Sequence, residues 1–110
     1  MGGRKSSLRS AADFTRVMSS GRRRHGAWLA VSVAPGTSEQ ARLGLVIGKR
    51  WAKRAVDRNA IKRILREAFR LESASLDRLD IVLRLRQAWP PEARVELAAE
   101  AHKLLKGSGL

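Results

Sequence analysis

The stretch AVDRNAIKRILREAFRL, residues 55–71, decides how this sequence folds. Its apolar side chains recur at intervals of three and four residues, at Ile61, Ile64, Leu65 and Ala68. This period places them on one face of an α-helix. We therefore predict an amphipathic helix from about residue 55 to residue 71, whose apolar face packs against the rest of the chain.

The opposite face of this helix is cationic. Between residues 49 and 70 the acids are Asp57 and Glu67 alone, so basic residues four apart have almost no acids between them. Like charges at that spacing destabilise an isolated helix by a few tenths of a kcal/mol. A fold that tolerates this cost is expected to use the face for binding phosphates. The polar residues of this sector, roughly 140° wide, are Arg58, Asn59, Lys62, Arg63, Arg66 and Arg70.

Three segments around the helix alternate apolar and other residues, as strands do. They are residues 27–33, 42–48 and 79–85. We expect the first two to form an antiparallel pair. In the first segment one face carries Leu29, Val31 and Val33, and the other carries Trp28, Ala30 and Ser32.

Two further helices are expected towards the ends of the chain. Ser10 is followed three residues later by Asp13, the pattern of a capping box, and a helix then places Phe14, Val17 and Met18 on one face and ends at Gly21. We expect residues 22–26 to form a basic loop. Pro90-Pro91-Glu92 is typical of a helix start, and that last helix stops at Gly107.

The order of elements is therefore α-β-β-α-β-α, an α+β sandwich whose helices pack on one small, mostly antiparallel sheet. Residues 1–9 are basic and polar and are expected to form a flexible arm, with a single domain at residues 10–107. A length of 110 residues fits one domain.

Composition narrows the class of protein. The chain has 23 Lys and Arg against 10 Asp and Glu, a net charge of +13, which predicts a polyanionic partner, nucleic acid before an anionic membrane. It has no cysteine, which excludes disulfides and thiolate metal sites. It has no apolar run of the roughly 18 residues that a spanning helix needs, and its N-terminus does not read as a secretory signal. We expect a cytoplasmic protein.

The run from Ala55 to Arg70 resembles the signature helix of the bacterial ribonuclease P protein subunit. Residues 42–50 resemble the preceding strand and basic loop of that family, residues 13–18 its first helix and residues 79–84 its last strand. The resemblance covers roughly residues 8–105, in the same order, and the Arg-Asn-x-Ile-Lys-Arg run is specific. It implies the same α-β-β-α-β-α fold, with a left-handed crossover at the signature helix.

The resemblance implies a protein that binds the catalytic RNA of ribonuclease P and the 5′ leader of precursor tRNA, and assists endonucleolytic removal of that leader. The holoenzyme is then a ribonuclease whose catalytic site and Mg²⁺ belong to the RNA. No catalytic residue, metal or cofactor is expected in the protein, and no membrane or obligatory protein partner.

Two binding surfaces follow from the resemblance, position by position. The surface for the RNA subunit comprises Lys49, Arg50, Lys53, Arg54, Arg58, Asn59, Lys62, Arg63 and Arg66. A groove between the first helix and the sheet would bind the leader through Phe14, Met18, Ala30 and Ser32, with Trp28 nearby.

The sequence departs from the family pattern at three positions. Ala60 stands where an Arg is usual, so one phosphate contact is expected to be lost or moved. Met18 and Ser32 stand where relatives often carry aromatic residues, so leader contacts would rely on Phe14 and Trp28 or be weaker.

Three alternatives stay open at this point. A ribosomal type of RNA-binding protein would share the size, charge and fold class. A protein-only nuclease would need an acid–base pair, for which the chain offers only His25 and His102, at no telling spacing, and Asp57 and Glu67, which we expect to pair with arginines. A membrane-surface peptide would not need the alternating strands.

Overall fold

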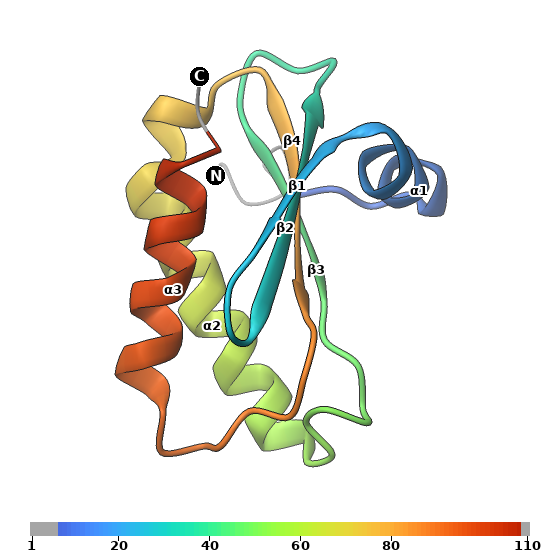
Figure 1. Ribbon diagram of the computed structural model, residues 1–110. Helices are drawn as coiled ribbons and strands as arrows, with labels where there is room; N and C mark the ends of the chain where they lie inside the picture. The colour runs from blue at the N-terminus through green and yellow to red at the C-terminus, as the bar shows by residue number, and fades with distance from the viewer. Residues whose placement is uncertain (1–6, 109–110) are drawn as a thin grey trace.

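The helix predicted at residues 55–71 is α2, Ala55–Glu72, in the computed structural model, which describes residues 7–108. Its apolar face buries Ile61, Leu65 and Ala68, as the periodicity predicted, and leaves Ile64 half-buried. Phe69 is buried as well, although the predicted face did not include it. A 3-10 turn, η1, Ser73–Leu76, continues it. α2 lies beside α3, Arg94–Lys106, and the two helices cover one face of the sheet (Figure 1).

The sheet has four strands in the order β1-β2-β4-β3. β2, Leu29–Pro35, is antiparallel both to β1, Arg22–His25, and to β4, Leu79–Leu85. β3, Arg42–Val46, is parallel to β4 and is connected to it through α2. The mostly antiparallel sheet is confirmed, and the parallel pair of β3 and β4 forms the crossover unit around α2.

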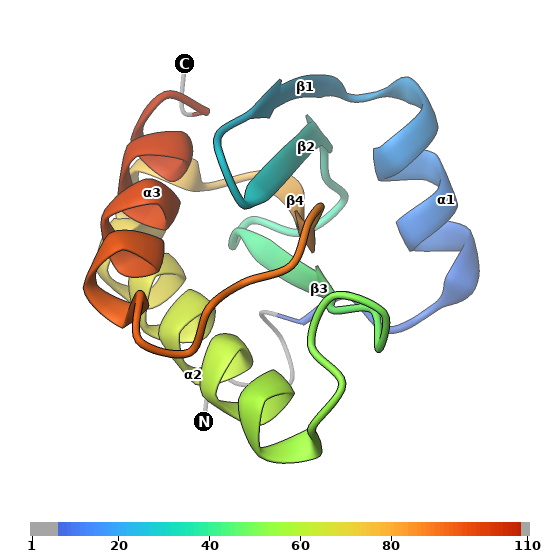
Figure 2. The same cartoon turned by 60° about the horizontal axis from the view of Figure 1, so that its bottom comes forward.

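The opposite face of the sheet is covered by α1, Ala11–Ser20 (Figure 2). Ser10 caps this helix, because its Oγ accepts the backbone N–H of Asp13 at 3.0 Å. The helix ends at Gly21, as predicted. A Cβ at Gly21 would lie 2.4 Å from the carbonyl oxygen of Val33, so glycine is what lets the end of α1 approach β2.

The apolar residues form two clusters, one on each face of the sheet. The main core lies under α2 and α3 and contains Val31, Leu83 and Leu97. The smaller cluster lies under α1 and contains Val17 and Val82. Within the strands, alternate residues fall into different clusters, so the predicted inward and outward faces of the strands are confirmed.

Two strand predictions are wrong. Residues 22–25 form β1 rather than a loop; all four side chains are polar and exposed, so no alternation revealed a strand. The predicted antiparallel pairing of the first two strands does not occur, because β4 lies between β2 and β3. β4 takes this central place because Ile81, Val82 and Leu83 bury both of its faces.

Some boundaries also differ from prediction. α3 starts at Arg94, since the Ala93 N–H bonds the Pro90 carbonyl at 2.9 Å and closes a turn first. β3 ends at Val46, two residues early. Of the predicted arm, residues 1–6 lie outside the described residues, whereas Leu8 is buried and its N–H donates to the Leu43 carbonyl at 2.9 Å.

Candidate nucleic-acid interface

The exposed face of α2 carries cations that no ion pair neutralises among the described residues, apart from Arg70. Arg63 and Arg66 are exposed, and Lys62 is half-buried. Across residues 7–108, no side chain of the nine predicted to bind the RNA subunit forms an ion pair with an acid. Glu67 pairs instead with Arg70 at 2.6 Å, and that hydrogen bond lowers the pKa of Glu67 below its ordinary value. The predicted pairing with an arginine is therefore confirmed for Glu67, whereas Asp57 forms no ion pair among the described residues.

The loop before α2 adds to this cationic face. Lys49, Arg50 and Lys53 are exposed, and the Arg50 guanidinium lies 4.4 Å from the centroid of the Trp51 ring. Arg58 connects loop and helix: its Nη1 donates to the carbonyl oxygens of Ala52, at 2.9 Å, and of Lys53, at 2.8 Å. Loop and helix therefore present one basic surface, comprising Lys49, Arg50, Lys53, Arg54, Arg58, Asn59, Lys62, Arg63 and Arg66.

Ala60 lies on the buried side of α2, 5% exposed. Its side chain is therefore part of the packing beneath the helix.

Four of the five predicted leader-binding residues lie on the α1 side of the sheet. Phe14 and Met18 pack against the small apolar cluster, and Ala30 and Ser32 share a face of β2 by alternation. The Phe14 ring lies against Gly44, where a Cβ would come within 2.6 Å of it.

Trp28 does not belong with these residues. It precedes β2 and packs against the main core, on the side of α2 and α3. The reason is a turn that α3 holds: the Glu100 carboxylate accepts the N–H groups of Ala27, Trp28 and Leu29 at 2.7–2.9 Å. Strand alternation therefore does not extend back to position 28, and the predicted face of Trp28 is wrong.

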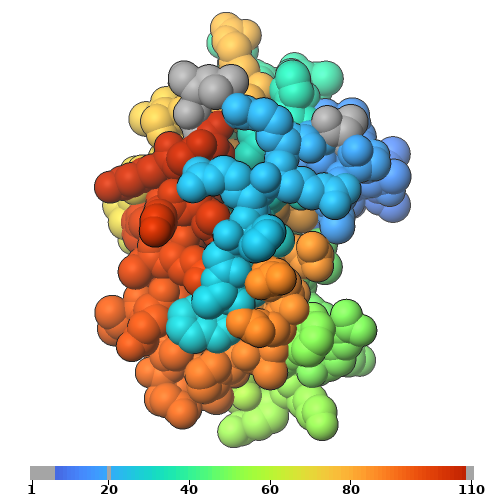
Figure 3. All heavy atoms as spheres, viewed as in Figure 1, coloured from blue at the N-terminus to red at the C-terminus, as the bar shows by residue number. Residues whose placement is uncertain are grey.

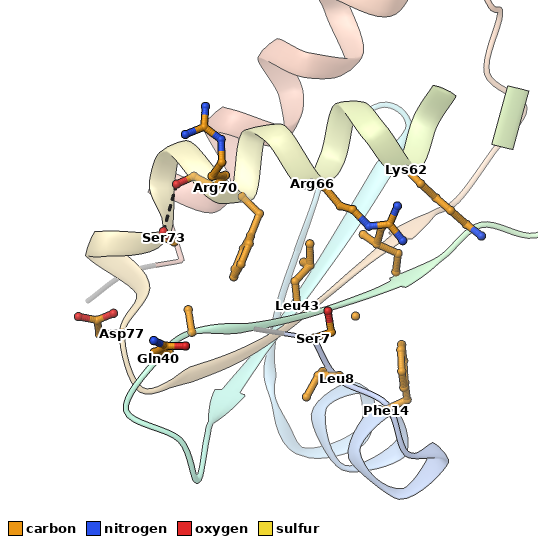
Figure 4. Close-up of a pocket in the computed structure, with 14 residues that line it drawn as sticks. Ser7, Leu8, Phe14, Gln40, Leu43, Lys62, Arg66, Arg70, Ser73 and Asp77 are labelled. Atoms are coloured by element: carbon orange, nitrogen blue, oxygen red, sulfur yellow. Dashed lines mark hydrogen bonds between the residues drawn. The ribbon is translucent and has the colours of Figure 1, made fainter. Parts of the chain in front are cut away.

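A cleft of about 910 Å³ opens between α2 and the edge of β3 (Figure 4). Lys62, Arg66 and Arg70 line it from α2, Leu43 lines it from β3, and Phe14 from α1. It combines cations that suit a phosphate with apolar surface that suits a base. It also joins members of both predicted binding surfaces, which sequence reasoning kept apart because its walls come from three separate segments.

A buried carboxylate that the sequence reasoning missed anchors α1. Asp80 on β4 is fully buried and accepts hydrogen bonds from Arg42 Nε, at 2.9 Å, and Arg42 Nη2, at 2.7 Å. Arg16 of α1 donates to the same carboxylate. Burial raises the pKa of Asp80, but the hydrogen bonds from Arg42 and Arg16 outweigh it, so the pKa lies below its ordinary value.

The two histidines lie in different places. His25 is exposed on edge strand β1, and His102 of α3 lies 3.0 Å from the Glu72 carboxylate of α2. Among residues 7–108 no group of three or more His, Asp or Glu side chains is arranged to hold a metal ion. No hydrogen bond joins the two histidines in the part of the chain that the structure describes, and His102 pairs instead with Glu72.

Fold and charge together define a small α+β protein whose exposed helix carries a cationic face suited to nucleic acid. No helix of the described chain is long and apolar enough to cross a membrane. The family model for ribonuclease P matches residues 3–108. The chain therefore belongs to the bacterial ribonuclease P protein family, and its role is that of a ribonuclease P protein subunit.

Individual relatives support this family assignment. The ribonuclease P protein component of Chromobacterium violaceum is 45% identical over 84 residues, which are 76% of this chain and 69% of the relative. That of Pseudoalteromonas translucida is 32% identical over 102 residues, 93% of this chain and 73% of the relative.

Solved structures have the same fold. The ribonuclease P protein of Staphylococcus aureus superposes with a TM-score of 0.81 at 26% identity, covering 92% of this chain and 93% of that one. The ribonuclease P protein of Thermotoga maritima, solved in complex with 1-(4-fluorophenyl)-2-thiourea, superposes with a TM-score of 0.75 at 25% identity. The superposition covers 90% of this chain and 96% of that one. The ribosomal-type alternative is not favoured.

Proposed function

We propose that this protein binds the RNA subunit of ribonuclease P through the basic surface and holds the 5′ leader of precursor tRNA on the α1 side of the sheet. In the holoenzyme, the RNA carries the catalytic site and its Mg²⁺ ions. The protein supplies affinity for the substrate and helps cleavage proceed when Mg²⁺ is scarce. The expected compartment is the cytoplasm.

The observation that carries this proposal is the unneutralised charge of the basic surface. Guanidinium groups bind phosphates in a bidentate way, and Asn59 can both donate to and accept from a ribose or a base edge. Arg58 holds the loop against α2, so loop and helix form a continuous surface that can follow an RNA backbone.

The position of α1 supports a separate place for the leader. Phe14, Met18, Ala30 and Ser32 lie on the face of the sheet opposite the main core. The cleft at the edge of β3 connects Phe14 with Lys62 and Arg66, so a leader strand there would lie close to the RNA-binding helix.

The test is precursor-tRNA cleavage at low Mg²⁺ with a bacterial ribonuclease P RNA, in the presence and absence of this protein. We expect the protein alone to be inert and the mixture to cut at the 5′ end of the mature tRNA. Binding to the RNA subunit should weaken by orders of magnitude between roughly 50 and 200 mM salt, since several phosphates are contacted.

Two results would contradict the proposal. Cleavage by the protein without RNA would revive the nuclease alternative. Tight binding to both RNAs with no gain in cleavage would mean a general RNA-binding role.

A further inference from the structure

One row of residues crosses the sheet beside α1 and is left uncovered by that helix. Strand register aligns His25 of β1 with Ala30 of β2, Arg84 of β4 and Val46 of β3. We call this row the open strip. His25 is exposed and the other three are half-buried, whereas in the neighbouring row Ser32, Val82 and Gly44 are buried.

Arg84 is the unusual member of the open strip. It lies on a central strand, where charged side chains are rare, and it faces the α1 side, as Asp80 and Val82 do by alternation. Among the described residues it has neither an ion-pair partner nor a hydrogen-bond acceptor for its side chain.

The contrast with Asp80 shows what Arg84 lacks. Asp80 is four residues earlier on the same face of β4, and two arginines neutralise it. The neighbouring row also uses its arginine within the fold, since Arg23 donates to the carbonyl oxygen of Met18 at the end of α1. Arg84 keeps its donors free in a half-buried position, where an anion is bound more strongly than at a fully exposed site.

The surroundings of the open strip fit a nucleic-acid strand. Val46 packs against the same small apolar cluster as Phe14 and Met18 of α1. At the other end β1 forms an exposed ridge between α1 and α3 (Figure 3), with His25 on the same face of the sheet as Arg84. Trp28 packs on the opposite side of the sheet, so of the predicted leader-binding residues Phe14 is the aromatic one on the α1 side.

We propose that Arg84 binds a backbone phosphate of the precursor-tRNA leader, with the open strip as the path of that strand. Recognition of the leader on this face is then electrostatic and tolerant of base sequence, since the side chain with free donors is a guanidinium. This inference rests on the proposed function and adds to it a residue and a mode of binding.

The experiment measures dissociation constants of the reconstituted holoenzyme for precursor tRNA with an unstructured eight-nucleotide leader and for mature tRNA. Wild type is compared with Arg84→Gln, Arg84→Lys and the matched control Arg94→Gln, which removes an exposed arginine at the start of α3, on the other face of the sheet. A second set of substrates carries a single methylphosphonate at successive leader positions.

We expect Arg84→Gln to weaken precursor-tRNA binding about tenfold, the usual scale for one charge-assisted hydrogen bond. Mature tRNA should bind as before, Arg84→Lys should retain most of the affinity, and Arg94→Gln should behave as wild type. One methylphosphonate should reproduce the loss with wild type and add little to Arg84→Gln, because both changes remove the same contact.

Three results would overturn the inference. Arg84→Gln could bind precursor tRNA as tightly as wild type does, or it could lose as much affinity for mature tRNA as for precursor tRNA. The third is that no single methylphosphonate weakens the binding of wild type while leaving that of Arg84→Gln nearly unchanged. If Arg84→Gln proves unstable in thermal unfolding, the Arg84→Lys variant and the methylphosphonate scan on wild type still test whether Arg84 contacts a leader phosphate. Failure of wild type to promote cleavage would reject the proposed function itself, whereas normal cleavage with Arg84 dispensable would reject this inference alone.

Discussion

Asp80 shows how one residue ties three elements together. Its carboxylate is inaccessible to solvent and receives Arg42 from β3 and Arg16 from α1. A buried charge with both partners in place is tolerated, but removal of one charge leaves the others unpaired. The orientation of α1 over the sheet therefore depends on this carboxylate.

Replacement of Asp80 by Asn should destabilise the fold by about 3–5 kcal/mol at pH 7, as for a broken buried ion pair. Because the folded pKa of Asp80 is lowered, its contribution is present above the unfolded pKa, about 3.9, and is lost as the pH falls through the lower folded value. Urea unfolding at pH 7 and at pH 3 measures this. Wild type should lose more stability than Asp80→Asn over that interval.

An exposed acid provides the control for this pH dependence. Glu92 lies in the turn before α3 and is exposed, so Glu92→Gln should retain the wild-type dependence on pH. Equal pH dependence in wild type and Asp80→Asn would show that the network around Asp80 does not stabilise the fold.

At the scale of elements, the loop before α2 is held by the helix that follows it. Arg58 contacts the carbonyls of Ala52 and Lys53 through one guanidinium nitrogen. Lys62, one turn further along, has no such contact with the loop among the described residues. The two side chains therefore differ in role although both belong to the basic surface.

We predict that Arg58→Ala weakens binding of the ribonuclease P RNA by roughly tenfold or more, and Lys62→Ala by only a few-fold, the scale of a single phosphate contact. The larger loss follows because the loop cations lose their fixed place along with Arg58. Filter binding at constant salt measures both, with circular dichroism to confirm that the variants fold.

Arg58→Lys separates charge from geometry. A lysine keeps the charge but lacks the planar fork that can hold the loop and a phosphate together, so it should bind only slightly better than Arg58→Ala. If Arg58→Ala binds the RNA as tightly as Lys62→Ala does, Arg58 does not hold the loop in place for binding.

At the scale of the whole molecule, a net charge of +13 on 110 residues opposes folding. Anions that bind the basic surface relieve this repulsion and stabilise the folded state by mass action. We therefore expect the charge that attracts RNA to lower the stability of the fold when no anion is bound.

Sulfate should accordingly raise the thermal midpoint by about 5–10 °C over chloride at the same ionic strength, since 1 kcal/mol corresponds to about 4–8 °C in a domain of this size. Thermal unfolding followed by circular dichroism measures this shift. Equal midpoints in the two salts would mean that the folded protein binds no anion specifically.

The sequence by itself determined the features that repeat locally. The period of Ile61, Ile64 and Leu65 determined α2 and its cationic face, alternation determined which strand residues face the main core, and Ser10 and Gly21 determined the ends of α1. Each of these depends on residues a few positions apart, so a short window of sequence contains the whole signal.

The tertiary structure alone decided what depends on residues far apart. It inserted β4 between β2 and β3, made a strand of Arg22–His25, and turned Trp28 towards α3 through Glu100. It likewise placed two arginines around Asp80, whereas Arg84 has no acidic partner within residues 7–108. Strand order, buried ion pairs and clefts depend on contacts between distant segments, and a periodic pattern within one segment carries no information about its partners.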